Sequence, residues 1–246
     1  CDMDKIMDVA NRHNLLVVED AAQAIDSYYI SPKTGEKKAL GSIGHLAAFS
    51  FHETKNIISG EGGMLAINDM QFADRAEIIW EKGTNRSAFF RGDVDKYGWV
   101  DIGSSFLPSE LIAAFLWAQL ENLDNIQQQR LQLWNNYEQK LADWAKQKQI
   151  RLGQIPSFAT KNGHMFYIVC KDLQQRTDLL AHLKSNGILA VFHYLSLHNS
   201  KYYADKHDGR DLPMTDRYSD CLIRLPMFYG IDAEMQDYII DTILTF

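Results

Sequence analysis

The feature that most constrains this chain is a short, uniformly apolar run, Leu15-Leu16-Val17-Val18, which ends at the acidic pair Glu19-Asp20. A strand that is apolar on every residue is typical of a parallel sheet covered by helices on both faces. Just before the run, residues 3–10 carry apolar side chains at helical spacing. The order of helix, buried strand and acid at the carboxyl end of the strand predicts an α/β fold that binds its ligand beyond the strand ends.

A sheet of this kind does not begin with a helix, because each helix connects two parallel strands. The helical pattern at residues 3–10 has no strand before it. We therefore expect the N-terminal part of the first domain to be missing from this chain.

Size and composition indicate a globular protein with a sizeable core. The 246 residues are 46% hydrophobic and 23% charged and include five prolines, unlike the composition of a disordered chain. The formal net charge of −7 argues against duplex nucleic acid as a partner, which needs a basic face, and leaves a small anionic ligand open. No apolar run approaches the roughly 20 residues that span a bilayer, and we expect a cytoplasmic protein.

Neither the cysteines nor the histidines indicate a metal site. Cys1, Cys170 and Cys221 lie far apart and form no CxxC pair, a pattern that fits a reducing compartment. The eight histidines have no HxxxH-type spacing. The segment Gly60-Glu61-Gly62-Gly63 lacks the spacing of a nucleotide-binding P-loop and precedes a strand. We expect its glycines to allow a sharp turn and a close approach of backbone.

Two domains are expected, at residues 1–125 and 126–246. Beyond residue 20, the elements predicted for the first are strands at 45–51 and 64–67, a helix at 73–81 and a long loop at 83–103. A helical pattern from residue 108 to about 149 predicts a long connector between the domains. The elements predicted for the second are strands at 164–170, 188–194 and 222–225 and helices at 172–186 and 233–244.

Three polar side chains, Asp20, Ser50 and Lys55, stand at or just after the ends of predicted buried strands. An acid at such an end needs a cationic or hydrogen-bonding partner, although Asp20 could equally cap the next helix. Lys55 is either an ordinary surface lysine or a Schiff-base lysine with a desolvated amine. Ser50 offers a hydroxyl of the kind that holds a phosphate. Together the three fit pyridoxal phosphate (PLP), which needs a lysine, an acid at its pyridine nitrogen and donors around its phosphate.

A set of motifs runs along the chain in an order shared with a known enzyme family. The motifs are Glu19-Asp20-Ala21-Ala22-Gln23-Ala24, Phe49-Ser50-Phe51-His52-Glu53-Thr54-Lys55-Asn56, Gly60-Glu61-Gly62-Gly63, Gly187-Ile188, His193-Tyr194, Leu197-His198 and Leu225-Pro226. They resemble the DegT/DnrJ/EryC1/StrS family of sugar aminotransferases over essentially the whole chain. The resemblance implies a three-layer α/β/α PLP-dependent transferase fold of the aspartate aminotransferase type (fold type I), N-terminally truncated, with a small α+β C-terminal domain.

The resemblance also implies a role for each matching residue at the cofactor. Lys55 matches the lysine that links the cofactor, Asp20 the acid at the pyridine nitrogen and Ser50 the serine that binds the phosphate. Gln23 matches the residue near the phenolic oxygen of the cofactor, and Ala22 matches a residue that packs on the ring.

Five further residues are candidates for the phosphate and substrate sites. Ser105 stands where the family has an asparagine that reaches the phosphate from the neighbouring subunit. Arg86 and Arg91 are candidates to bind the diphosphate of the substrate or to form salt bridges between subunits. His193 and Tyr194 match a segment near the sugar nucleotide, and His193 could instead be structural.

The implied reaction transfers an amino group from L-glutamate to a nucleotide-linked 4-keto-6-deoxy sugar, in a homodimer with a shared active site. Lys55 argues against a related dehydratase branch in which histidine replaces the lysine. The alternative is a non-catalytic fragment or binding module that keeps Lys55 but has too little of the sheet to hold the cofactor. Ser196 stands where the family has proline, and we expect a looser loop there.

Overall fold

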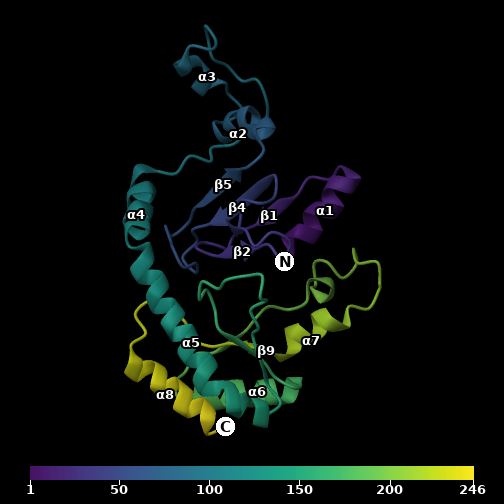
Figure 1. Cartoon of the computed structure of the whole chain (residues 1–246), viewed down its shortest axis with the longest axis vertical. Coiled ribbons are helices and arrows are strands. Elements are labelled where there is room, and N and C mark those ends of the chain that lie inside the picture. The colour runs from purple at the N-terminus through teal and green to yellow at the C-terminus, as the bar shows by residue number, and fades with distance from the viewer. The chain divides into compact units, whose positions relative to one another are not determined.

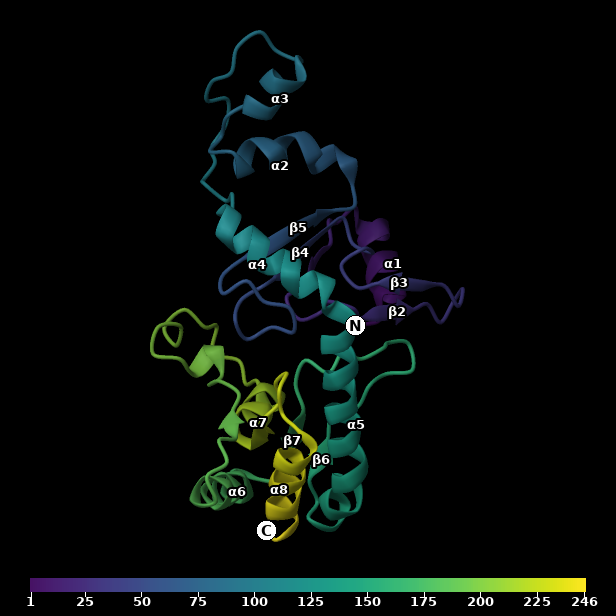
Figure 2. The same ribbon diagram turned by 90° about the vertical axis from the view of Figure 1, so that its left-hand side faces the viewer.

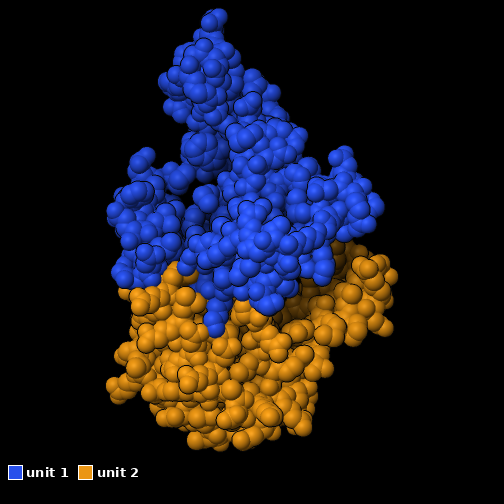
Figure 3. Space-filling view, viewed as in Figure 1, with its two compact units in different colours: residues 1–125, 156–162 blue, residues 126–155, 163–246 orange.

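The structure is a computed structural model that describes residues 1–246. The chain forms two compact units, which Figure 3 shows in different colours. Unit 1 comprises residues 1–125 and 156–162, and unit 2 comprises residues 126–155 and 163–246.

Unit 1 combines short strands with helices (Figure 1). Its elements are α1 (Met3–His13), β1 (Val18–Asp20), β2 (Tyr28–Ile30), β3 (Lys37–Ala39), β4 (Leu46–Ser50), β5 (Gly63–Ile67), the 3₁₀ turn η1 (Met70–Phe72), α2 (Ala73–Trp80), α3 (Arg86–Arg91) and α4 (Glu110–Glu121). The strands predicted at 45–51 and 64–67 are thus confirmed as β4 and β5. The predicted loop at 83–103 contains a short helix, α3.

Unit 1 contains a three-stranded sheet with the order β1-β4-β5 (Figure 1). Figure 2 shows β4 and β5 from the side. β1 runs parallel to β4, with Val18 opposite Leu46 and Asp20 opposite Ala48. β5 runs antiparallel to β4. β2 and β3 form a separate antiparallel pair. The carboxyl ends of β1 and β4 therefore lie at the same edge of the sheet.

The prediction that residues 15–18 form a strand buried on both faces is wrong for this structure. The strand begins only at Val18, whose exposed fraction is 62%, and Leu15 and Leu16 are exposed as well. The physical reason is that no other residues pack closely over the side chains of Leu15, Leu16 and Val18, which therefore stay exposed. Leu15, Leu16 and Val17 line an open apolar groove with α1 instead.

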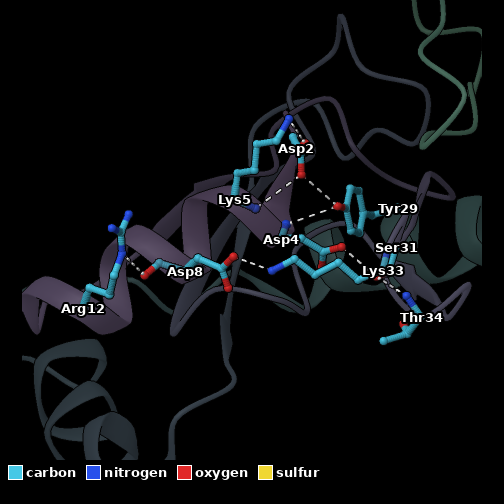
Figure 4. Close-up of polar contacts among 9 residues, drawn as sticks. All are labelled: Asp2, Asp4, Lys5, Asp8, Arg12, Tyr29, Ser31, Lys33 and Thr34. Atoms are coloured by element: carbon cyan, nitrogen blue, oxygen red, sulfur yellow. Dashed lines mark hydrogen bonds and ion pairs between the residues drawn. The ribbon is translucent and has the colours of Figure 1, made fainter.

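Side chains of α1 and the β2–β3 region form a polar network at the start of the chain (Figure 4). Asp2 caps the helix by accepting a hydrogen bond from the Lys5 N–H (3.3 Å). The Tyr29 hydroxyl donates to Asp2 Oδ1 (3.1 Å) and accepts from the Asp4 N–H (3.1 Å). Ser31 Oγ donates to Asp4 Oδ2 (2.7 Å). These bonds attach the first turn of α1 to the β2 region.

Residues 156–162 belong to unit 1, whereas the sequence analysis assigned them to the second domain. The backbone explains the difference, because the segment pairs with the edge of β2. The Ile30 N–H donates to the Phe158 oxygen (2.8 Å), and the Thr160 N–H donates to the Tyr28 oxygen (2.9 Å). Such pairing between residues more than 120 positions apart leaves no periodic signal in the sequence.

Residues 81–106, which include α3, form an arm with two crossing backbone segments. The Val100 N–H donates to the Gly83 oxygen (2.8 Å), and the Lys82 N–H donates to the Ser104 oxygen (3.1 Å). A Cβ atom at Gly103 would lie 2.1 Å from the Gly83 nitrogen. Only glycine fits this crossing.

Unit 2 is an α+β unit with a four-stranded antiparallel sheet. Its strands β6 (Arg151–Leu152), β7 (Tyr167–Val169), β8 (Val191–Phe192) and β9 (Leu222–Arg224) have the order β6-β7-β9-β8. Its helices are α5 (Leu123–Gln147), which begins at the end of unit 1, α6 (Leu173–Ser185), the 3₁₀ turn η2 (Leu197–Asn199), α7 (Pro213–Cys221) and α8 (Ala233–Leu244). The core joins α5, α6, α8, β7 and β9 through buried side chains such as Tyr137, Phe166, Leu179, Ile223 and Ile240.

The long helix predicted from residue 108 to 149 is two helices, α4 and α5, which meet at Asn122. The helix α7 was not predicted, because its sequence from Pro213 to Cys221 has few apolar residues at helical spacing. Near the start of α5, the buried Arg130 donates to the oxygens of Gly163 (3.1 Å) and His164 (2.7 Å). Burial lowers the pKa of Arg130 to about 10, so it stays charged at neutral pH.

We predict that the attachment of α1 weakens at low pH. The hydrogen bond from Ser31 is the main reason that the pKa of Asp4 lies below its ordinary value of 3.8. A carboxylate with a lowered pKa in the folded state stabilises fully above the unfolded pKa, and this contribution disappears as the pH falls through the folded pKa. Asp4→Asn, which removes the charge, should therefore lower the urea midpoint of unfolding at pH 7 and lower it by less at pH 3.

The control for this experiment is Asp211→Asn, which changes an exposed aspartate in unit 2. It should leave the urea midpoint unchanged at both pH values. An equal effect of Asp4→Asn at pH 7 and pH 3 would show that the carboxylate charge plays no part.

Candidate functional site

The candidate site begins with two polar side chains on one face of the sheet. Asp20 ends β1 opposite Ala48, and Ser50 ends β4 two residues further on. Residues that pair across parallel strands, and residues two apart on one strand, share a face. Asp20 and Ser50 therefore point to the same side at the carboxyl end of the parallel pair.

Asp20 is exposed, contrary to the expectation of a buried acid. The Ala22 N–H donates to its Oδ1 atom (3.1 Å), which directs the carboxylate across the turn that follows β1. Two successive turns complete this acid loop, residues 21–27, in which the Ala24 N–H bonds the Ala21 oxygen and the Ser27 N–H bonds the Ala24 oxygen (both 2.9 Å). Asp20 thus neither lies in a core nor caps a helix, and its carboxylate is accessible to a ligand.

Lys55 lies in the lysine loop, residues 51–62, which joins β4 to β5. Its N–H bonds the His52 oxygen (2.9 Å), and the two sides of the loop pair through the Glu53 N–H to the Gly60 oxygen (2.9 Å) and the Phe51 N–H to the Gly62 oxygen (2.8 Å). Lys55 is half-buried, and the next residue, Asn56, is buried. The lysine therefore stands on a loop with a defined backbone.

The glycine segment at 60–63 forms the return of this loop, as its composition suggested. A Cβ atom at Gly63 would lie 2.9 Å from the Phe49 oxygen on β4, so the strands meet closely where the loop closes. Ser50 Oγ accepts a hydrogen bond from the His52 N–H (3.3 Å). Its own hydroxyl hydrogen can still be donated to a ligand oxygen.

Gln23 and Ala22 lie in the acid loop, directly after Asp20. The Gln23 side chain is exposed, and the Ala22 side chain is half-buried. The backbone oxygens of Gln23 and Ile25 both accept hydrogen bonds from the Asn162 amide (2.8 Å each). Asn162 was not singled out in the sequence, because it lies 139 positions from Gln23 in a segment without a recognisable motif.

Glu19 is a second residue that sequence reasoning missed. Its carboxylate accepts hydrogen bonds from the N–H groups of Gly41 (2.8 Å), Ile43 (2.7 Å) and Gly44 (2.6 Å). Short bonds from backbone to a charged oxygen are stronger than neutral ones. Glu19 therefore fixes the turn that leads into β4, while its neighbour Asp20 points to the opposite face of the sheet. The turn-rich Gly41–Gly44 sequence was the one available signal.

The three candidates on the arm, Ser105, Arg86 and Arg91, are occupied by contacts within the arm and with α2. Ser105 forms a bridge with Glu81 and is exposed. Arg86 lies 3.7 Å from Glu81 and stacks over the Phe90 ring. Arg91 pairs with Glu77 (2.7 Å) and Asp93 (3.0 Å), which raises its pKa.

A phosphate group would have to compete with these carboxylates for either arginine. The arrangement shows that the carboxylates which balance the two arginines come from the same chain, and it leaves their role toward substrate as a prediction.

His193 and Tyr194 lie in unit 2, directly after β8. The His193 Nδ1 atom is buried without a hydrogen-bond partner. Burial, and secondarily the charge of Arg224, lowers the pKa of His193, so it is neutral at pH 7. Tyr194 stacks against it at 4.7 Å between ring centroids and has a left-handed backbone with φ of 55°.

The loop after Tyr194 is anchored, contrary to the expectation drawn from Ser196. Ser196 is buried and donates to Asp216 Oδ1 on α7 (2.8 Å). The same oxygen accepts from Asn199 (2.9 Å) and lies 3.1 Å from His198 Nε2. The serine hydroxyl thus supplies a tether that a proline ring could not.

Comparison with known proteins identifies the class. The structure superposes on solved aminotransferases, with a TM-score of 0.84 to DesV from S. venezuelae (28% identity, covering 100% of this chain and 61% of that one). It also matches an aminotransferase from Brucella abortus with a TM-score of 0.81 (26% identity, 99% and 60% coverage). The fold predicted from the sequence, that of the PLP-dependent aminotransferases of fold type I, is confirmed.

A model of one family matches residues 1–244, and the chain belongs to that family, the DegT/DnrJ/EryC1/StrS aminotransferases. A curated relative is the spore coat polysaccharide biosynthesis protein SpsC of Bacillus subtilis, 28% identical over 99% of this chain and 62% of the relative. The chain spans about 60% of the length of these relatives. No helix in it has both the length and the apolar character needed to cross a membrane.

We predict that Glu19 is a structural residue whose loss destabilises unit 1. Glu19→Gln replaces one of the two acceptor oxygens by an NH2 group, which cannot accept a hydrogen bond. Depending on which oxygen is replaced, the N–H of Gly41, or those of Ile43 and Gly44, lose their acceptor. The expected loss is about 1–3 kcal/mol in the free energy of unfolding, because buried N–H groups are left without a partner. Chemical denaturation measures it, and Glu36→Gln, an exposed glutamate on the same unit, should change it by less than about 0.5 kcal/mol. Equal effects of the two substitutions would contradict this role.

Proposed function

We propose that this chain binds PLP and transfers an amino group from an amino acid to a nucleotide-linked keto sugar. The observation that carries the proposal is the placement of Asp20 and Ser50 on one face at the carboxyl edge of β1 and β4, with Lys55 on the loop that leaves the same edge. Ligands of open α/β sheets bind at this edge. The family membership of the chain supports the same activity.

The residues at this edge fit the chemical needs of PLP. An accessible carboxylate (Asp20) suits a protonated pyridine nitrogen, a hydroxyl (Ser50) suits a phosphate oxygen, and an amine (Lys55) can form the covalent link. Gln23 would bond the phenolic oxygen and Ala22 would pack on the ring. The related sugar aminotransferase Spr1654 of Streptococcus pneumoniae has been solved in PLP and PMP forms.

When bound, PLP supplies an electron sink that stabilises negative charge on the carbon next to the transferred nitrogen. The Asp20 carboxylate keeps the facing ring nitrogen protonated. The Lys55 amine would accept the proton from Cα of the donor amino acid and return a proton on the other side of the transferred nitrogen. A base held in position for this step is worth about 10²–10⁴-fold in rate. Ser50 anchors the phosphate so that the ring stays in register with both groups.

The proposed substrate is a dTDP-4-keto-6-deoxy sugar, with L-glutamate as the amino donor. The motifs that support it are Glu81-Lys82-Gly83-Thr84-Asn85-Arg86-Ser87, Phe90-Arg91-Gly92 and Asp101-Ile102-Gly103-Ser104-Ser105, which resemble the transaminase that forms dTDP-4-amino-4,6-dideoxygalactose. In this proposal Arg86 and Arg91 exchange their carboxylate partners for the diphosphate, and His193 and Tyr194 contact the sugar nucleotide. Ser105 contacts the cofactor phosphate of a partner subunit.

The product would be a cytoplasmic precursor of a cell-surface polysaccharide, such as enterobacterial common antigen or lipopolysaccharide. The B. subtilis relative, a spore coat polysaccharide biosynthesis protein, supports this class of product.

The direct test is to fix the cofactor on the chain. Borohydride treatment after incubation with PLP should add one cofactor mass to the tryptic peptide that contains Lys55. Lys55→Ala should abolish the addition and lower turnover at least about a hundredfold, because the proton-transferring amine is lost. Asp20→Asn should keep the addition and lower turnover at least about tenfold, because a neutral amide does not hold the ring nitrogen protonated.

Lys146→Ala, an exposed lysine on α5 in unit 2, is the matched control and should behave as the unsubstituted chain. Failure of the unsubstituted chain to take up saturating PLP would instead support a non-catalytic module.

A second part of the proposal is a homodimer, with the arm and α4 as its surface. Large apolar side chains are exposed to solvent on the arm and on α4. Trp99 and Leu111 are each 84% exposed, and Phe90, Ile102 and Trp117 are also exposed. Apolar patches of this kind mark protein interfaces. A second copy of the chain is the partner that we propose for this surface. In the family the active site is shared between subunits, and Ser105, the candidate contact to the cofactor phosphate of the partner, lies on the same arm.

We predict that Trp99→Glu with Leu111→Glu shifts the chain from dimer to monomer. Charges buried in an apolar interface are unfavourable, and a loss of at least about a hundredfold in association is expected. Sedimentation velocity measures the shift. Leu189→Glu, at an equally open leucine in unit 2, should leave the dimer intact. A monomeric unsubstituted chain that turns over substrate would refute the dimer.

A further inference from the structure

The acid loop and the lysine loop are joined by two buried asparagines, Asn56 and Asn162. Asn56 follows Lys55 directly, and its Nδ2–H donates to the backbone oxygen of Asn162 (2.8 Å). The Nδ2 group of Asn162 in turn donates both of its hydrogens to the acid loop, at the oxygens of Gln23 and Ile25 (2.8 Å each). The exposed fractions of the two side chains are only 5% and 6%. A continuous chain of hydrogen bonds thus runs from the residue beside Lys55 to the loop that follows Asp20.

We call Asn56 and Asn162, with the hydrogen bonds that they donate, the asparagine bridge. Asn162 belongs to a segment whose backbone is itself held by hydrogen bonds. Asn162 ends the segment 156–162, which pairs with β2 through Phe158 and Thr160. The Tyr28 N–H also donates to Thr160 Oγ1 (2.9 Å). Asn162 therefore cannot follow the movement of either loop without breaking this pairing.

The chemistry of the bridge requires asparagine at position 162. Two backbone oxygens converge on one nitrogen, and a primary amide is the short side chain that offers two N–H donors from a single atom. An aspartate of the same shape would place a charged acceptor against two carbonyl oxygens. Buried carbonyl groups that lose their donors are unfavourable, so the acid loop would move to find other partners.

We propose that Asn162, with Asn56, is a positioning residue that sets the spacing between Lys55 and the Asp20–Gln23 loop. The inference rests on the proposed PLP site, since Lys55 and Asp20 must meet opposite parts of one small ring. Neither asparagine touches the cofactor in this proposal. They act through the backbone of the two loops that carry the cofactor ligands, and a shift of about 1 Å in such a geometry is enough to lower activity strongly.

The hydrogen bonds to the acid loop and those to the lysine loop can be removed separately. Asn162→Ala and the isosteric Asn162→Asp remove the donors to the acid loop but keep the backbone oxygen that Asn56 uses. Asn56→Ala removes the hydrogen bond that connects the lysine loop to Asn162, and leaves the hydrogen bonds from Asn162 to the acid loop in place. The matched control is Asn136→Ala, which removes a half-buried asparagine on α5 that bonds Gln236 (2.7 Å) in unit 2.

The first measurement is amide hydrogen exchange of the chain without cofactor. Asn162→Ala and Asn162→Asp should speed exchange in residues 21–27 at least tenfold, and Asn56→Ala should do so in residues 51–60. The amides of Ile30 and Thr160, which hold the segment 156–162 to β2, should exchange as before. Unchanged exchange in both loops would overturn the proposal, whether or not the chain binds PLP.

The second measurement is binding of PLP, followed by its visible absorbance across a pH range. All three substitutions in the bridge should weaken binding about tenfold or more and shift the pH midpoint of the absorbance, and Asn136→Ala should do neither even where it lowers stability. Uptake by the unsubstituted chain tests the proposed function. Variants that bind PLP with the affinity and pH midpoint of the unsubstituted chain would overturn the positioning role alone.

Discussion

The parallel pairing of β1 with β4 is the interaction on which the candidate site depends. Three residue pairs, from Val18 opposite Leu46 to Asp20 opposite Ala48, bring together segments almost 30 positions apart. A shift of one residue in this register would turn either Asp20 or Ser50 to the opposite face. The antiparallel strand β5 follows the lysine loop. Asp20, Ser50 and the loop that carries Lys55 therefore lie at the same end of the sheet, where β1 and β4 finish.

Hydrogen bonds from side chains to backbone hold that edge in shape. Glu19 bonds three N–H groups in the turn before β4, and Asn162 bonds two oxygens in the acid loop. Neither side chain is a proposed ligand. A loop that has no strand pairing of its own needs such partners for its backbone groups, and they supply rigidity where the ligand residues are placed. Glu19 and Asp20 are consecutive residues of β1, so their side chains lie on opposite faces of the sheet. Glu19 bonds the turn before β4, and Asp20 is left accessible on the other face.

The groups assigned to the substrate are of a different kind from those assigned to the cofactor. Arg86 and Arg91 are balanced by carboxylates of the arm and of α2, so a diphosphate would have to replace these partners. His193 is kept neutral by burial and by Arg224, with one ring nitrogen unsatisfied. Asp20, Ser50 and Lys55, by contrast, form a set of side chains that suits PLP.

The sequence by itself determined the family, the fold class and the order of the cofactor residues, because motifs around Asp20 and Lys55 depend on local chemistry that a short segment records. It also located β4, β5 and the helices α6 and α8 to within a few residues. It did not reveal that residues 156–162 pair with β2, that Asn162 joins two loops, or that Ser196 is tethered to Asp216, since each depends on a partner distant in the chain. The exposure of β1 likewise depends on which residues pack over it, and the local sequence does not record them. The sequence shows which side chains are apolar and how they are spaced, and only the tertiary structure decides which of them are buried against other residues.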